Sequence, residues 1–446
     1  MSANPFQAAA PNLSSPNPLH ESPPLPTKQA FLPKPPATWG EVGINDLWVE
    51  GLLLKWLLAK GSLTGHAIAR YLCLPYTLVE MLLQRLKQSM AIAHKSTTSM
   101  GDFDYQLTDD GRRRALIARD ESAYLGPVPV PLNDYVTSIT AQSVKDECPD
   151  EIRLRKAFSD LTMPDHLFDI LGPAVASGKG LFLYGEPGNG KTSVAERICL
   201  SFNSAIWIPT TIMAEGQVIQ VFDSQCHEKT TETNNPLGMS QPDARWVQIE
   251  RPAVVVGGEL TLDALDIQLN RTTQVAEAPL QLKANGGVFL IDDFGRQIVE
   301  PAALLNRWIV PLEKRVDYLT LPNGQKITVP FDPLIIFSTN LDPKALVDDA
   351  FLRRIPYKIH IENPSRQTFE TIMRGVAKKF GIEYSDDAFD YLVKTHYDGK
   401  RPFRACQARD LLDQVLQMAR YKRQKPQMTP DSLNAACANY FSAMGQ

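Results

Sequence analysis

Three short runs of consecutive apolar residues mark the middle of the chain, and stretches with helical spacing follow them. The runs lie at 181–184 (LFLY), 287–291 (GVFLI) and 334–337 (LIIF). Strands that are apolar on both faces are typical of a parallel sheet covered by helices on each side. Residues 363–446 are patterned as helices throughout. The chain is therefore expected to be an α/β protein with a parallel sheet and a C-terminal helical lid.

A different pattern precedes this core. Residues 42–122 carry three helical patterns, two short strand-like runs and a further helix, at 47–59, 65–72, 78–87, 90–94, 104–107 and from Thr108 onward. Three helices, a two-stranded wing and a helix make up a winged helix-turn-helix. The segment looks like the DNA-binding domains of that superfamily, in which the third helix enters the major groove. We predict a small α+β winged-helix domain here.

Composition sets the remaining boundaries. Residues 1–41 hold ten prolines and show no apolar periodicity, which predicts a disordered proline-rich arm. Residues 123–155 are expected to form a linker that is extended first and helical at its end. The α/β core is expected over 156–362, ahead of the lid. In the lid, Ser385 and Thr429 are expected to cap helices.

The core carries an insert at 212–258. Within it, 218–222 and 245–249 are expected to be paired strands, with the polar loop 223–244 between them. A loop of that length is usually functional or disordered.

Residues 185–192 read GEPGNGKT and fit G-x-x-x-x-G-K-[ST], the pattern of a phosphate-binding loop. An apolar run precedes the loop and a helical pattern follows it, so its N–H groups and the helix N-terminus would face an anion. A glycine-rich turn without a ligand is the alternative. Lys191 would bridge the β- and γ-phosphates, and Thr192 would bind Mg²⁺. The candidate nucleotide-binding residues are Gly185, Glu186, Pro187, Gly188, Asn189, Gly190, Lys191, Thr192 and Ser193.

Two later strands end in polar residues that suit the same chemistry. Asp292 and Asp293 follow the run at 287–291, and Asn340 ends the strand that begins at Leu334. Asp292 would hold Mg²⁺ through water, and Asp293 would orient or deprotonate the attacking water. Asn340 would hydrogen-bond the γ-phosphate or that water. The alternative for each is a polar strand end.

Arginines complete the series of motifs. Arg353 and Arg354 end a helical stretch, and Arg409 lies near the start of the helix that opens at Ala405. A planar guanidinium suits the charge that develops on a transferring phosphoryl group. A solvated basic helix end is the alternative for the pair. Each motif is ambiguous alone, whereas their order along one chain is specific.

That order resembles the AAA+ ATPases over roughly residues 155–446. Carried over by position, the loop matches Walker A, Asp292 with Asp293 matches Walker B, and Asn340 is similar to sensor 1. Arg354, or its neighbour Arg353, matches the arginine finger, and Arg409 matches sensor 2. The resemblance implies ATP and Mg²⁺ as cofactors. It also implies a homo-oligomeric ring, expected to be a hexamer, in which the finger comes from the neighbouring subunit.

Within AAA+, residues 308–340 resemble the MoxR-like, helix-2-insert branch, in which a helix and a hairpin precede the sensor 1 strand. Asn323-Gly324 between alternating apolar residues is a hairpin signal in its own right. One departure concerns catalysis. The family usually has Glu after the Walker B Asp, whereas this chain has Asp293, whose side chain is one methylene shorter. ATP binding is thus expected more firmly than fast hydrolysis.

Composition agrees with a large globular protein of a reducing compartment. The net charge is −4, and the six cysteines form no C-x-x-C pair, so neither a polyanion-binding surface over the whole chain nor a metal site is expected. No apolar run is long enough to span a membrane, and the first residues lack signal-peptide features. A cytoplasmic protein without membrane insertion is expected.

The charge of the winged-helix segment bears on its partner. Residues 44–122 contain ten Lys and Arg against nine Asp and Glu, and the third helix has only Arg85 and Lys87 as cations. A DNA-reading surface is normally more basic, so a protein target is favoured and DNA stays possible. The favoured function is an ATP-hydrolysing ring motor or remodeller with a recruited macromolecular target. The alternatives are a slowly hydrolysing ATP switch or scaffold, and a DNA-binding regulator or helicase-loader-like ATPase.

Overall fold

The computed structural model describes residues 31–97, 102–147, 149–202, 204–230, 241–347 and 349–442. Most of the predicted proline-rich arm therefore lies outside the described residues. Its predicted end at residue 41 is too late, because helix α1 occupies Trp39–Val42 and the Thr38 side chain accepts a hydrogen bond from Glu41 N.

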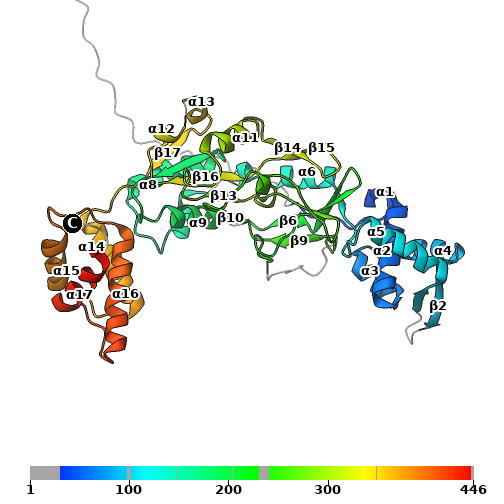
Figure 1. The fold of residues 1–446 in the computed structure, drawn as a ribbon, viewed down its shortest axis with the longest axis horizontal. Coiled ribbons are helices and arrows are strands. Elements are labelled where there is room, and N and C mark those ends of the chain that lie inside the picture. The colour runs from blue at the N-terminus through cyan, green and yellow to red at the C-terminus, as the bar shows by residue number, and fades with distance from the viewer. Residues whose placement is uncertain are drawn as a thin grey trace, which may run out of the picture. The chain divides into compact units, whose positions relative to one another are not determined.

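The predicted order of helices and strands is present from Asp46 to Glu121 (Figure 1). The elements are α2 (Asp46–Lys60), β1 (Ser62–Thr64), α3 (Gly65–Leu72), α4 (Tyr76–Gln88), β2 (Ile92–Thr97), β3 (Phe103–Leu107) and α5 (Asp109–Glu121). Strand β1 is absent from the sequence prediction, and it pairs antiparallel with β3 to give the order β1-β3-β2. Buried side chains such as Leu53, Ile68 and Leu82 form the core of this part.

A five-stranded parallel sheet forms the centre of the α/β core. Its order is β10-β13-β16-β5-β17, from β10 (Ala253–Val256), β13 (Val288–Ile291), β16 (Leu334–Thr339), β5 (Leu181–Tyr184) and β17 (Tyr357–His360). The three predicted apolar runs are thus the three middle strands. Parallel strands end at the same edge, so the residues that follow β5, β13 and β16 meet there.

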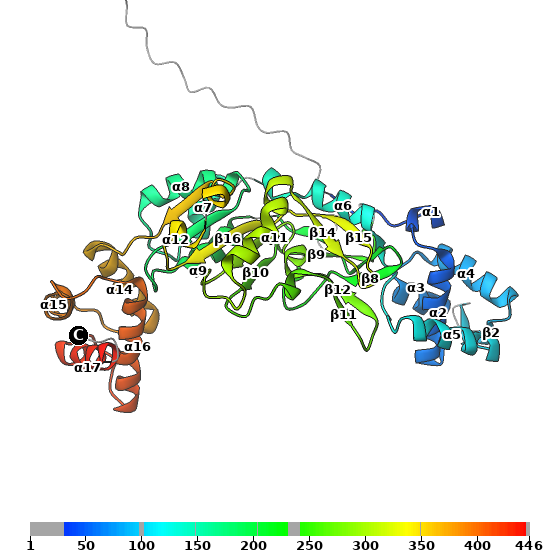
Figure 2. The same ribbon diagram turned by 45° about the horizontal axis from the view of Figure 1, so that its top comes forward.

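The two faces of this sheet bury alternate residues of each strand. Leu181 and Leu183 face the cluster that packs under α7 (Glu151–Ala157), α8 (Asp165–Ala176) and α9 (Lys191–Ser201). Phe182 and Phe337 pack on the other face with Trp308 of α11 (Pro301–Lys314). Helix α9 contacts β13 and β16, and α8 contacts β17. Figure 2 labels α8, α9 and β16 in this part of the fold. Helices on both faces explain why these strands are apolar throughout.

The insert pairs differently from the sequence prediction. Strand β8 (Gln217–Gln220) joins a second sheet, of order β11-β12-β8-β7-β4, whereas β9 (Trp246–Ile249) pairs with β6 (Ile206–Pro209). The expected pairing of 218–222 with 245–249 is therefore wrong. The other strands of the second sheet are β4 (Val130–Pro131), β7 (Thr211–Ala214), β11 (Gln268–Asn270) and β12 (Val275–Glu277).

Two predicted boundaries also change. Strand β10 lies inside the range 212–258 yet belongs to the central sheet, so the insert ends before Ala253. The range 123–155 contains β4, α6 (Leu132–Ala141), the 3₁₀ turn η1 (Val144–Asp146) and the start of α7. Buried Tyr135 of α6 packs in the core of the second sheet. This range is therefore a folded part of the protein rather than a mainly extended linker.

The helix and hairpin predicted before the third strand are present. Helix α11 is followed by β14 (Val316–Thr320) and β15 (Lys326–Pro330), which pair antiparallel around Asn323-Gly324. Gly324 has φ +85°, which a glycine adopts without strain. Short helices α10 (Leu280–Lys283), α12 (Pro343–Leu346) and α13 (Asp349–Leu352) and the 3₁₀ turn η2 (Asp263–Leu265) complete the core.

The C-terminal region is helical, as predicted. It consists of α14 (Arg366–Phe380), α15 (Asp386–Leu392), the π-helical turn η3 (Val393–Tyr397), α16 (Ala405–Tyr421) and α17 (Pro430–Phe441) around their own apolar core. Ser385 accepts a hydrogen bond from Ala388 N and Thr429 from Ser432 N, so both predicted caps are confirmed. No helix within the described ranges is both long and apolar enough to cross a membrane.

Candidate nucleotide-binding site

The GEPGNGKT segment forms a tight loop between β5 and α9. Gly185, Gly188 and Gly190 have φ values of +143°, +86° and +80°, which side chains other than hydrogen rarely permit. A Cβ on Gly185 would lie 2.3 Å from the carbonyl oxygen of Ile361. The glycines therefore allow the backbone conformation of the loop, and Gly185 also allows the loop to lie close to the segment after β17.

Lys191 is folded back onto its own loop. Its Nζ donates to the carbonyl oxygens of Gly185 and Glu186, both at 3.0 Å, and to Oδ1 of Asn340 at 2.7 Å. Only 6% of the residue is exposed. Burial lowers the pKa of Lys191, and the carboxylates of Asp292, Asp293 and Glu186 oppose that shift. A buried ammonium with three oxygen partners is suited to exchange those partners for an anion.

The hydroxyl of Thr192 donates to Oδ2 of Asp292 at 2.7 Å. Asp292 follows β13 directly, and its backbone N–H is held by the carbonyl of Val256 at 2.8 Å. A hydroxyl and a carboxylate at this distance are oxygen donors of the type that Mg²⁺ prefers. Nowhere in the described ranges are three or more His, Cys, Asp or Glu side chains gathered so that they could hold a metal ion. Mg²⁺ would thus need phosphate oxygens and waters as further ligands.

Asp293 has a left-handed backbone, with φ +48°. Its Oδ1 accepts from Nδ2 of Asn340 at 2.9 Å, and its N–H donates to Oδ1 of Asp292 at 3.0 Å. The next residue, Phe294, bonds to β16 through its N–H and the carbonyl of Ser338 at 2.7 Å. Because β16 lies between β5 and β13, Asn340 stands between the loop and the acidic residues and contacts both.

The predicted arginines make other contacts. Nε of Arg354 donates to Oε1 of Glu313 in α11 at 2.6 Å, and Arg353 is exposed. Nε of Arg409 donates to the adjacent Asp410 at 3.1 Å, and 69% of the Arg409 side chain is exposed. The network described above joins Lys191 and Asn340 without these three guanidinium groups.

Sequence reasoning missed the residue that brings a guanidinium to the loop. Arg404, just before α16, donates to Oε2 of Glu186 at 3.2 Å. The N–H groups of Ala405 and Cys406 reach Oδ1 of Asn189 at 3.2 Å and the carbonyl of Gly188 at 2.8 Å. The sequence places Arg404 at the start of a helix, which is the one signal that could have identified it. Its contact with the loop depends on tertiary packing, which the sequence pattern does not show.

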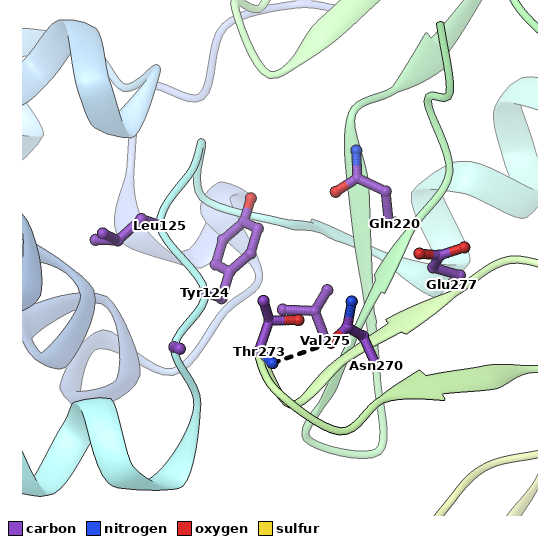
Figure 3. A pocket seen from close by; sticks show the side chains of 8 residues that line it. Tyr124, Leu125, Gln220, Asn270, Thr273, Val275 and Glu277 are labelled. Atoms are coloured by element: carbon purple, nitrogen blue, oxygen red, sulfur yellow. Dashed lines mark hydrogen bonds between the residues drawn. The ribbon is translucent and has the colours of Figure 1, made fainter. Parts of the chain in front are cut away.

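Two cavities lie away from this network. One, of about 380 Å³, is lined by residues that include Tyr124, Leu125, Gln220, Thr273 and Glu277 (Figure 3). The other, of about 580 Å³, lies beside α3 and the loop at 241–244. Neither is lined by a residue of the phosphate loop.

Comparisons with known proteins show only partial or weak similarity to this chain. Residues 365–439 match a family model described as a domain of unknown function (DUF8689). No curated protein sequence matches the chain. NtrX from Brucella abortus in complex with ADP is similar in structure with a TM-score of 0.40 and 15% identity, over 64% of this chain and 58% of NtrX. The chain thus spans less than two thirds of the length of NtrX.

RuvB from Thermotoga maritima, described as a Holliday junction branch migration motor, is similar with a TM-score of 0.38 and 14% identity. The match covers 64% of this chain and 73% of RuvB. These low scores assign neither a family nor an activity, so function has to be argued from the site itself.

Proposed function

We propose that this protein is an AAA+ ATPase that binds and hydrolyses ATP with Mg²⁺. The proposal rests mainly on one observation. The phosphate-loop residues Lys191 and Thr192 make direct hydrogen bonds to Asn340 and Asp292, at the carboxyl edge of a parallel sheet. A glycine-rich turn or a polar strand end has no need of these contacts, whereas phosphoryl transfer needs all of these groups in one place.

Each group has a role that follows from its position. The ammonium of Lys191 would leave Asn340 and the loop carbonyls for the phosphate oxygens. Thr192 and Asp292 would hold Mg²⁺, which neutralises charge on the phosphates when it is bound. Asp293, held by Asn340, would orient the attacking water and accept its proton. Arg404 would exchange the carboxylate of Glu186 for phosphate.

We further propose that the active form is a ring, with Arg354 or Arg353 reaching the site of the next subunit. Arg354 is the first choice and Arg353 the second. Nε of Arg354 donates to Glu313 at 2.6 Å, so its guanidinium would exchange that carboxylate for the phosphate of the next subunit.

The amino-terminal helices would recruit a protein target. Of the two cations of α4, Arg85 differs from what a DNA-reading helix requires, because it is held by Asp46, at 2.6 Å, and by Glu50, both in α2. Those carboxylates raise the pKa of Arg85 through hydrogen bonds, with burial opposing them, and they cancel its charge towards a phosphate backbone.

One observation favours the alternative function, a switch that binds ATP but hydrolyses it slowly. Asp293 is short, and its Oδ1 already accepts from Asn340. A carboxylate so held would contact water less freely than a Glu would. Such a protein would bind ATP and recruit partners with little turnover.

Nucleotide binding is the first test. We expect Lys191→Ala to abolish ATP binding, because the one buried ammonium of the loop is lost. The matched control is Lys179→Ala, at an exposed lysine just before β5. Isothermal titration with ATP and Mg²⁺ measures both variants. Unchanged affinity in Lys191→Ala would remove the site assignment.

A further inference from the structure

Asn189 is a loop residue whose side chain turns to the C-terminal helical region. Its Nδ2 donates to Oδ1 of Asn363 at 2.7 Å, and its Oδ1 accepts from the N–H of Ala405 at 3.2 Å. Asn363 lies in the connection between β17 and α14, and Ala405 is the first residue of α16. One amide therefore contacts both the entry to the helical region and the helix nearest the loop.

The chemistry of this contact is specific to an amide. Asn189 is 8% exposed, and both ends of its side chain are used, one as donor and one as acceptor. The N–H of Ala405 can only donate, so the oxygen of Asn189 has to face it. A carboxylate would lose the donor, and an apolar side chain would leave the part-buried N–H of Ala405 without this partner, which destabilises the contact.

The neighbouring residue strengthens the same contact. The carbonyl of Gly188 accepts from Cys406 N at 2.8 Å. A Cβ on Gly188 would lie 2.4 Å from Sγ of Cys406, so a larger residue there would have to displace the Cys406 side chain or the loop. Loop and helix are thus in direct contact over two successive residues.

We propose that Asn189 is a positioning residue that couples the nucleotide loop to the C-terminal helices. Whatever moves the loop then moves both Asn363 and the start of α16, and docking of the helices in turn holds the loop in shape. Coupling of this kind is reciprocal: ATP would tighten the docked helices, and docking would raise the affinity for ATP. The statement about ATP rests on the proposed ATPase function, whereas the contact between the loop and the helices does not.

Hydrogen exchange of the full-length protein tests the coupling directly. In Asn189→Ala, we expect the amides of 403–408 to exchange about fivefold faster or more than in wild type without nucleotide, as the loss of a part-buried hydrogen bond predicts. Asn363→Ala should give a smaller increase. Asn363→Asp keeps an oxygen acceptor for Nδ2 and should restore wild-type exchange. Asn439→Ala, at an exposed position of α17, is the control and should change nothing at 403–408.

The same variants are then measured by hydrogen exchange in the presence of ATP and Mg²⁺. ATP with Mg²⁺ should slow exchange at 403–408 in wild type, and this effect should shrink in Asn189→Ala together with the affinity. Equal exchange in wild type and Asn189→Ala without nucleotide would overturn the proposal. If wild type does not bind ATP, the proposed function fails, while the nucleotide-free comparison still decides on Asn189. Should Asn189→Ala fail to fold, Asn363→Ala and Asn363→Asp measure the same contact from its other side.

Discussion

At the scale of single residues, the backbone of Asp293 is as informative as its carboxylate. A left-handed φ of +48° is uncommon outside glycine, and Asp and Asn tolerate it best. The hydrogen bond from Asn340 and the one to Asp292 hold this conformation. Strained positions cluster where function fixes a side chain, so Asp293 is the residue to test first for catalysis.

Asp293→Asn should keep ATP binding and lose turnover. Asn fits the same backbone conformation and still accepts from Asn340, but it cannot take a proton, so phosphate release should fall by about 10² or more. Asp293→Glu restores the longer carboxylate and should hydrolyse at least as fast as wild type. Phosphate release under saturating ATP measures both. Wild-type rates in both variants would mean that Asp293 is not the base.

The sequence located most of the network but not its connection to the lid. Lys191, Thr192, Asp292, Asp293 and Asn340 each end or follow a buried strand, and the parallel topology brings strand ends together. Motif spacing alone was enough for this step. Arg404, Asn189 and Asn363 meet only because the C-terminal helices pack on the loop, and no local pattern records that packing.

At the scale of elements, those with strong local patterns were predictable, whereas β1, β4, α6 and the pairing of the insert strands were not. The central strands, the hairpin at Asn323 and the lid helices have strong local signals. The pairing of β8 and β9 is set by partners distant in sequence, since β8 pairs with β7 and β12, and β9 with β6. The predicted insert 212–258 includes edge strand β10, because no pattern in AVVV (253–256) ties that run to the central sheet.

The start of α16 gives a prediction that separates two arginines. Arg404→Ala should weaken ATP binding about tenfold or more, because a charge-assisted contact with phosphate is lost. Arg409→Ala, five residues further along the same helix, should change it little. Titration with ATP compares the two variants in one experiment. If Arg409→Ala weakened ATP binding more than Arg404→Ala, Arg409 would be the arginine that contacts phosphate.

At the scale of the whole molecule, a shared site predicts complementation. Lys191→Ala subunits keep the arginine, and Arg354→Ala subunits keep the loop. In a random equal mixture, half of the loops are intact and half of those face an intact arginine, so turnover should reach about one quarter of wild type. Phosphate release from the mixture and from each variant alone measures this. Turnover that stays at the level of the separate variants, and is constant per subunit on dilution, would favour a monomeric switch.

The amino-terminal part gives a second whole-molecule prediction. The full-length protein should bind random duplex DNA weakly and with a shallow salt dependence, because Arg85 is neutralised. The double variant Asp46→Asn, Glu50→Gln frees Arg85 from its carboxylate partners. The plot of log affinity for DNA against log salt concentration should then become steeper by about one released counterion. Fluorescence anisotropy at two salt concentrations measures both proteins. Tight, strongly salt-dependent binding by wild type would make the DNA-acting function the leading one.

The three hydrogen bonds of Lys191 also bear on which anions the site would favour. An anion that takes the ammonium has to displace one or more of these three oxygen partners. A lone inorganic phosphate offers few further contacts to offset that exchange, whereas a triphosphate with Mg²⁺ would also engage Thr192 and Asp292. The contacts of Lys191 would therefore favour a nucleotide over inorganic phosphate.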